Sequence, residues 1–428
     1  MMHQRKGFVM NYVEKMISTL EEGNLKEAEK YYKRVKSLGT DEDKFYLAEE
    51  LYHLGFLEEA KELFEGLLKK FPGEGELVVL LAETLVEMNN EEEAMSLLSG
   101  LNEKDPEYPR ALLLLADLYQ MQGLFEVSEQ KLIKAKSILP YEPIIDFALG
   151  ELYSETGRFL EALRHYQELI KADMKEVAGV QINQRIAESL SAGGAFEEAL
   201  IQYEEALEDH LEINTLFGYA FTAFQAGFYQ KAIEKFNAVK ELDPDYHSVY
   251  LLLAKAYERE EDLKNSLQTI KEGIKHDEYN KEMYFFGGKI ALKLGEEEEA
   301  EKLLRESLAI DQGYLDAALT LNKLFQKQDR FEDILEIVNI IENEGEEDPQ
   351  LYWDSAVANQ GVENYKDALK QYQRAYTFFK EHPEFLKEYG DFLVEEGRHQ
   401  EAMKIYQQLL NKQPSNDEVL SILERLQE

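Results

Sequence analysis

Eight histidines are the first candidates for catalytic or metal-binding chemistry in this chain. They are scattered, and no two of them lie four residues apart: His3, His53, His165, His210, His247, His276, His382 and His399. The His-Glu-x-x-His pattern of zinc enzymes is absent, so zinc chemistry has no support. The chain has no cysteine, which excludes thiolate catalysis, disulfides and cysteine-bound metal.

One glycine-rich stretch superficially resembles a phosphate-binding loop. Gly287-Gly288-Lys289 lacks both the upstream glycine and the following Ser or Thr of such a loop. The patterns Gly-x-Ser-x-Gly and Gly-x-Gly-x-x-Gly are absent, and carboxylate pairs are too numerous for any one of them to be informative. We therefore expect no enzymatic activity, no cofactor and no metal.

The composition indicates a soluble, folded and strongly acidic protein. The chain has 428 residues, 44% of them apolar, and 86 acidic side chains against 47 basic ones give a net charge of −39. So much negative charge disfavours binding to nucleic acid. No apolar run is long enough to span a membrane, and the N-terminus lacks the pattern of a signal peptide. We therefore expect a cytoplasmic protein that does not bind membranes.

An internal repeat predicts the helices that would position any functional side chain. The pattern Gly-x-aromatic-x-x-Ala recurs along the chain, and its last residue marks twelve copies at intervals of 32 to 37 residues, mostly 34: Ala28, Ala60, Ala94, Ser128, Ala162, Ala199, Ala232, Ser266, Ala300, Ile334, Ala368 and Ala402. Another small residue lies twelve positions before most of these markers, and a large residue lies four positions after each. Small beside large is what two closely crossing helices require.

Each repeat is predicted to form a helix A, a short turn and a helix B. Apolar residues in both segments follow the i, i+3, i+4, i+7 spacing of an amphipathic helix. The turn carries glycine in eight repeats, and Asn89 or Asp329 in two others, all residue types that tolerate a left-handed backbone. All nine prolines fall between repeats, where none interrupts a helix. Clusters of glutamate open several B helices, where carboxylates favour the positive end of the helix dipole.

This pattern resembles the tetratricopeptide repeat family over about residues 9–415, and the chain is also similar to cytosolic proteins of this kind from Bacillus-type bacteria. The resemblance implies an all-α fold, an α-solenoid in which about twelve helix-turn-helix units form a right-handed superhelix with a concave groove lined mainly by A helices. We expect a lead-in at 1–8, repeats 1 to 5 at 9–176, repeats 6 to 12 at 177–415 and a capping helix at 416–428. The longest interval separates repeats 5 and 6 and predicts a hinge or a local change of the superhelix near 173–179.

Charged and aromatic residues follow one face of the A helices in register. When each marker is numbered 20, position 9 is acidic in repeats 2 to 6: Glu49, Glu83, Asp117, Glu151 and Glu188. Repeat 7 carries three aromatic residues on the same face: Phe217, Phe221 and Phe224. Repeats 8 to 10 carry cations at positions 9 and 13: Lys255, Arg259, Lys289, Lys293, Lys323 and Lys327. In the resembled family this face lines the groove. The alternatives are an ordinary solvated face for the charges, and packing between helices for two of the phenylalanines.

These three zones predict a non-enzymatic scaffold or adaptor that binds an extended or helical segment of a partner protein. The partner's basic stretch would lie on the acidic zone, an apolar anchor on the phenylalanines and an acidic stretch on the lysines. The carboxylate clamp that the resembled family uses for chaperone tails is not expected, because no repeat has Asn at position 9. The alternative function is a peptide-sensing signalling regulator. Such regulators carry an N-terminal DNA-binding or effector domain, for which repeats that begin near residue 9 leave no room.

Overall fold

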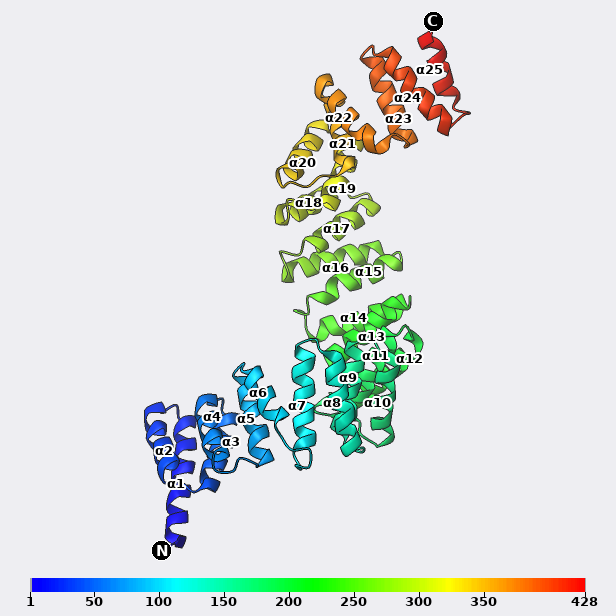
Figure 1. Ribbon diagram of the computed structural model, residues 1–428. Coiled ribbons are helices and arrows are strands. Elements are labelled where there is room, and N and C mark those ends of the chain that lie inside the picture. The colour runs from blue at the N-terminus through cyan, green and yellow to red at the C-terminus, as the bar shows by residue number, and fades with distance from the viewer. Residues whose placement is uncertain (1, 428) are drawn as a thin grey trace. The chain divides into compact units, whose positions relative to one another are not determined.

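The computed structural model describes residues 2–427, and the side chains of residues 12–208 and 210–426. Among these residues there are 25 α-helices and one small sheet. Contacts divide the chain into two compact parts, an N-terminal half, Met1–His210, and a C-terminal half, Leu211–Glu428. Within each half, successive helix pairs follow one another along the chain (Figure 1), as the repeat predicts.

The N-terminal half holds repeats 1 to 6. Its helices are α1 (Met2–Glu21), α2 (Leu25–Leu38), α3 (Asp41–His53), α4 (Leu57–Leu68), α5 (Gly75–Glu87), α6 (Glu91–Ser99), α7 (Tyr108–Met121), α8 (Phe125–Ile138), α9 (Pro143–Glu155), α10 (Phe159–Lys171), α11 (Ile182–Ala192) and α12 (Phe196–Asp209). Residues 2–8 of the predicted lead-in are part of helix α1. Odd-numbered helices are the A helices of the repeats, and each packs against the B helix that follows it.

The C-terminal half holds repeats 7 to 12 and one further helix. Its helices are α13 (Ile213–Gln225), α14 (Tyr229–Leu242), α15 (Ser248–Arg259), α16 (Leu263–His276), α17 (Lys281–Leu294), α18 (Glu297–Ile310), α19 (Leu315–Lys327), α20 (Phe331–Asn343), α21 (Pro349–Gly361), α22 (Tyr365–Phe379), α23 (Pro383–Glu395), α24 (His399–Lys412) and α25 (Asp417–Gln427). Helix α25 buries Val419 and Leu423 and exposes Asp417 and Glu424. A polar outer face of this kind is what the end of a stack of repeats needs.

The packing register predicted from the sequence is confirmed. All twelve marker residues are at most 1% exposed, including Ile334, and each large residue four positions later is also buried. The A–B turns that contain Gly, Asn89 or Asp329 all have a positive φ at that residue. In the two remaining repeats Glu261 and Glu363 adopt the same left-handed conformation, although glutamate rarely does so.

The long interval between repeats 5 and 6 forms a small β-hairpin. Strands β1 (Glu176–Val177) and β2 (Val180–Gln181) pair antiparallel, with Val177 opposite Val180. The turn residues Ala178 and Gly179 both have positive φ, as a tight two-residue hairpin turn requires. The boundary between the two compact halves lies further along, after His210, and a hinge at 173–179 stays a prediction.

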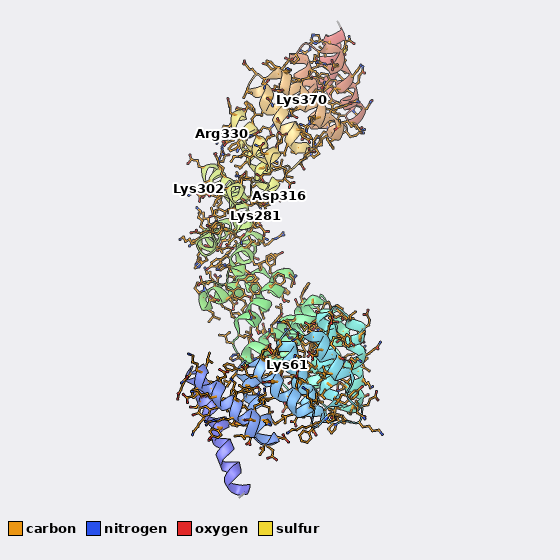
Figure 2. The ribbon with its side chains drawn as sticks, turned by 60° about the vertical axis from the view of Figure 1, so that its left-hand side comes forward. Lys61, Lys281, Lys302, Asp316, Arg330 and Lys370 are labelled. Atoms are coloured by element: carbon orange, nitrogen blue, oxygen red, sulfur yellow. The ribbon has the colours of Figure 1, made fainter. Side chains whose placement is uncertain are left out.

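Ion pairs join helices both between and within repeats. Lys61 of α4 lies 3.4 Å from Glu93 of α6 in the next repeat, and Lys281 of α17 lies 2.5 Å from Asp311, which follows α18 of the same repeat; both lysines are labelled in Figure 2. Exposed pairs of this kind each contribute about 0–1 kcal/mol. Among the described residues, no helix is long and apolar enough to span a membrane.

Candidate functional site

The five predicted acidic residues lie on successive A helices of the N-terminal half, but they differ in their partners. Glu83 of α5 is held by Arg110 of α7, whose Nη2 donates to both carboxylate oxygens at 2.7 and 2.9 Å. Glu49 of α3 has no ion pair within the described part of the chain, and burial and the nearby Glu76 carboxylate raise its pKa. The negative charge of Glu83 is therefore largely balanced from within the protein.

Glu151 and Glu188 share one arginine. Arg185, on α11, lies with its Nε 3.1 Å from Glu151 and its Nη1 2.6 Å from Glu188. Tyr166 of α10 also donates a 2.5 Å hydrogen bond to Glu151. Arg185 was not recognised as a site residue from the sequence, although its position between the two glutamates in the A-helix register was a usable signal.

Asp117 is the acidic residue that faces a groove without a partner. No other described side chain forms a hydrogen bond or ion pair with it. The groove lies between α7 and α9 and encloses about 420 Å³, with an apolar floor of Leu113, Ile144, Phe147 and Ala148 and further carboxylates at Glu151 and Glu155. Asp117 remains open to solvent on one side. Protein on its other sides desolvates the carboxylate and raises the pKa of Asp117 to about 6.

Of the three predicted aromatic residues, two pack against the next helix. The Phe217 ring lies 5.7 Å from that of the buried Phe236 in α14, and Phe224 meets Tyr229 edge to face at 5.6 Å. Phe221 stacks on Phe217 at 6.4 Å and is 37% exposed. Only Phe221 among the three therefore offers a substantial free apolar surface.

The six predicted cations also divide into paired and unpaired groups. Lys293 of α17 lies 2.5 Å from Glu258 of α15, and Lys327 of α19 lies 2.6 Å from Glu297 of α18. Four cations have no carboxylate within ion-pair distance in the part of the chain that the structure describes: Lys255, Arg259, Lys289 and Lys323. Lys289 lies over the Phe285 ring at 5.3 Å. Lys289 and Lys323 are exposed and Lys255 is half-buried.

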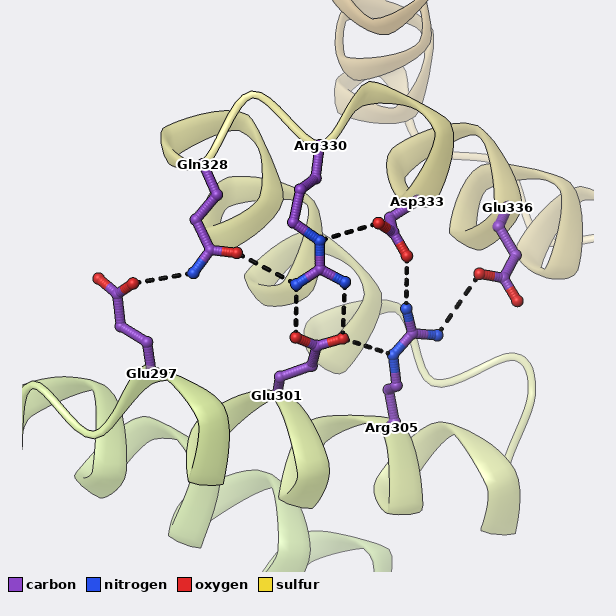
Figure 3. A network of polar contacts seen from close by, with 7 residues as sticks. All are labelled: Glu297, Glu301, Arg305, Gln328, Arg330, Asp333 and Glu336. Carbon is purple, nitrogen blue, oxygen red and sulfur yellow. Dashed lines mark hydrogen bonds and ion pairs between the residues drawn. The ribbon is translucent and has the colours of Figure 1, made fainter.

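Glu297 also belongs to a larger network that joins α18 to α20 (Figure 3). At its centre, Arg330 donates two hydrogen bonds to Glu301, at 2.6 and 2.9 Å, and one to Asp333 at 2.9 Å. Arg305 bonds the same two carboxylates at 2.9 and 2.8 Å. Each charged side chain at the centre of this network has a partner of opposite charge within the protein. The network therefore stabilises the repeats and leaves no free group for a ligand.

A second groove was not predicted from the sequence. It lies between α21 and α23, encloses about 350 Å³ and carries Glu388, Asp391 and Glu395 beside Val357 and Phe331. Burial raises the pKa of Glu388, which accepts a 2.7 Å hydrogen bond from Trp353 Nε1. The signal was available, since Asp391 occupies the same position 9 as Asp117.

The glycine pair that superficially resembled a phosphate loop lies inside α17. Gly287 and Gly288 are buried, and a Cβ at either position would collide with Ile270 or Leu304. They are packing residues. In the described part of the chain, no group of three or more His, Asp or Glu side chains is arranged to hold a metal ion.

The stacked helix pairs and the register of their buried residues define a tetratricopeptide repeat protein. Profiles of tetratricopeptide repeats match residues 51–118 and 282–314. Two further profiles, described as YpiA-like tetratricopeptide repeats and YpiA-like C-terminal tetratricopeptide repeats, match residues 120–174 and 349–416. The chain is 42% identical over 416 residues to the TPR repeat-containing protein YpiA of Bacillus subtilis strain 168, covering 97% of this chain and 98% of that protein. It belongs to the YpiA-like family.

Solved structures resemble the chain more distantly. One chain in the crystal structure of the APC/C hetero-tetramer Cut9-Hcn1 matches at 13% identity and a TM-score of 0.37, and the match covers 98% of this chain and 96% of that one. YrrB is described as a TPR protein with an unusual peptide-binding site. Its structure matches at 16% identity and a TM-score of 0.38, and the match covers 44% of this chain and 95% of the YrrB chain.

Proposed function

We propose that this protein is a non-enzymatic, cytoplasmic scaffold that binds segments of partner proteins on the exposed face of its A helices. Tetratricopeptide repeat proteins are in general protein-interaction scaffolds. The observation that supports the proposal here is the uneven pairing of charge. Five of the eleven predicted site charges have counter-ions within the chain, whereas six have none among the described residues: Glu49, Asp117, Lys255, Arg259, Lys289 and Lys323.

The two halves would recognise different features of a partner. The carboxylates of the N-terminal half suit a basic stretch. In the C-terminal half, exposed Phe221 suits an apolar side chain, and the lysines of α15, α17 and α19 suit an acidic stretch or a C-terminal carboxylate. Because exposed ion pairs contribute only about 0–1 kcal/mol each, these charges would mainly set the orientation and rate of binding.

The test is a charge reversal of the unpaired lysines. The full-length chain with Lys255→Glu, Lys289→Glu and Lys323→Glu is used to recover partners from an extract of the native host, followed by mass spectrometry. We expect partners that bind through acidic segments to be lost.

A matched control carries the same change of net charge on B helices: Lys302→Glu, Lys370→Glu and Lys404→Glu. These lysines are exposed on α18, α22 and α24 and have no ion pair within the described residues; the first two are labelled in Figure 2. Equal recovery of every partner by both triple variants would remove the lysines from the proposed site.

A further inference from the structure

The groove between α7 and α9 combines an apolar floor with negative charge. Its floor is made by Leu113 of α7 and by Ile144, Phe147 and Ala148 of α9. Met121, at the end of α7, lines the same groove and is 68% exposed. A groove lined by an exposed methionine and a half-buried phenylalanine offers a surface that adapts to an apolar side chain of a partner.

The carboxylates of this groove are held in place to different extents. Glu151 is fixed by Tyr166 and Arg185, and Glu155 accepts a hydrogen bond from Gln120. Asp117 lies between these elements with no partner of its own. The groove therefore offers one unpaired carboxylate, Asp117, together with two carboxylates held by other residues and the Phe147 ring.

We infer that this groove binds an arginine side chain of a partner segment whose neighbouring residues are apolar. The guanidinium would form an ion pair with Asp117 and lie against Phe147, and the neighbouring apolar side chains would cover Leu113, Ile144 and Met121. Arginine suits this arrangement better than lysine because its planar group both stacks on an aromatic ring and forms forked hydrogen bonds to a carboxylate. The inference rests on the proposed function and specifies its ligand in the N-terminal half.

Desolvation of Asp117 supports this assignment. The surrounding protein raises the pKa of Asp117 to about 6, which means that the ionised carboxylate is held at a cost in the free protein. A bound cation would remove that cost, whereas Glu83 and Glu188 already have arginine partners and gain less from a ligand.

The probe is a fluorescein-labelled synthetic peptide in which one arginine is flanked on each side by two leucines, with Gly-Ser ends. A matched peptide carries citrulline, which keeps the shape of arginine and removes its charge. Binding to the full-length chain is followed by fluorescence anisotropy. We expect the citrulline peptide to bind about tenfold more weakly than the arginine peptide, as for the loss of a charge-assisted hydrogen bond.

The protein variants locate that effect. Asp117→Asn should lower the affinity for the arginine peptide about tenfold and abolish the difference between the two peptides. Phe147→Ala should weaken both peptides. Glu205→Gln, an equal change of charge at an exposed position of α12, should change neither. A photo-reactive benzoylphenylalanine in place of one leucine should cross-link to α7 or α9.

Two outcomes would overturn the inference. One is equal binding of the arginine and citrulline peptides to the wild-type chain, a comparison that does not depend on whether a variant folds. The other is unchanged binding by a folded Asp117→Asn chain, which would place the peptide elsewhere and leave the proposed scaffold function intact. An unchanged set of partners after the lysine charge reversal would not bear on this groove, because those lysines lie in the other half of the chain.

Discussion

The groove between α7 and α9 and the groove between α21 and α23 occupy the same register in different repeats. In the first, Gln120 donates to Glu155 of the next A helix; in the second, Gln360 donates to Glu395 at 2.7 Å. In each groove, the carboxylate at position 9 of the second A helix also accepts a hydrogen bond. The donor is the large B-helix residue of the same repeat. Tyr166 donates to Glu151 at 2.5 Å, and Tyr406 donates to Asp391 at 2.6 Å.

The two grooves differ at the positions that decide their charge. Val357 stands in the second groove where Asp117 stands in the first. Lys387 of α23 corresponds to Phe147 of α9, and its Nζ lies 3.1 Å from both Asp391 and Glu418. Asp391 of the second groove is thus already paired with a cation of the same helix. Packing therefore repeats the framework in both pairs of repeats, while one or two surface positions per repeat change the charge of the groove.

The largest effect on stability is expected from substitution of the glycine that lies beneath each tyrosine. A Cβ at Gly150 would collide with the Tyr166 ring, and one at Gly390 with the Tyr406 ring. Gly150→Ala and Gly390→Ala should each lower the free energy of unfolding by about 1–3 kcal/mol, as overpacked cores do. Chemical denaturation measures this.

The control for these variants is Gly66→Ala. Gly66 is exposed on α4 and has no atom within 4 Å of an added Cβ, so alanine should stabilise that helix by about 0.5–1 kcal/mol. If only one of the two buried variants is destabilised, the grooves do not share the same packing.

The framework could be predicted because it follows from short-range rules. The buried register, the helix pairs and the left-handed residues Asn89 and Asp329 depend on residue types at fixed spacing, and the structure confirms them. The position of Gly150 beneath Tyr166 also follows from this register. Helical repeats allow such inference because each repeat contacts mainly its neighbours.

Whether each charged side chain has a partner of opposite charge could not be predicted in the same way. Whether Glu188 meets Arg185, or Lys293 meets Glu258, depends on side-chain rotamers and on the spacing between repeats. The same is true of Phe217, which packs on Phe236 instead of facing solvent. Spacing in the sequence places a residue on a face, but a long side chain on that face reaches several partners.

The next largest effect concerns the two tyrosine hydroxyls. Tyr166→Phe and Tyr406→Phe each remove a hydrogen bond to a carboxylate and should each lower the free energy of unfolding by about 1–2 kcal/mol. Burial, and the carboxylate that each hydroxyl contacts, raise the pKa of both tyrosines. Tyr141→Phe, at a residue 94% exposed, should have no effect. Unequal losses would show that Glu151 and Asp391 are held differently.

Exchanging the charge-determining residues tests the difference between the grooves. In a chain that carries Asp117→Val, the further change Val357→Asp should restore binding of the arginine peptide by about threefold, as one partly exposed ion pair allows. Recovery should be incomplete, because Lys387 already neutralises part of the second groove. Anisotropy titrations of the single and double variants measure this. No recovery would mean that Val357 is not equivalent to Asp117.

The smallest expected effect is the dependence of stability on pH. Because the fold raises the pKa of Asp117 from 3.8 to about 6, its contribution to stability is fully present below about pH 4 and is lost as the pH rises through 6. Asp117→Asn should therefore match the wild type near pH 4 and exceed its unfolding free energy at pH 7.5, by roughly a few tenths of a kcal/mol after screening by solvent. Denaturation curves at both pH values measure this.

Binding of the arginine peptide should depend on pH in the opposite direction, because the ligand requires the ionised carboxylate. Its affinity should rise between pH 5 and 7.5 in the wild type and stay flat in Asp117→Asn. The other titrating groups that line the groove with Asp117 are Glu151 and Glu155 of α9, and Glu83 of the preceding A helix is paired with Arg110. All of them are present in both proteins, so their contributions cancel in the comparison. A wild-type affinity that does not change with pH would mean that the desolvated Asp117 carboxylate does not bind the peptide.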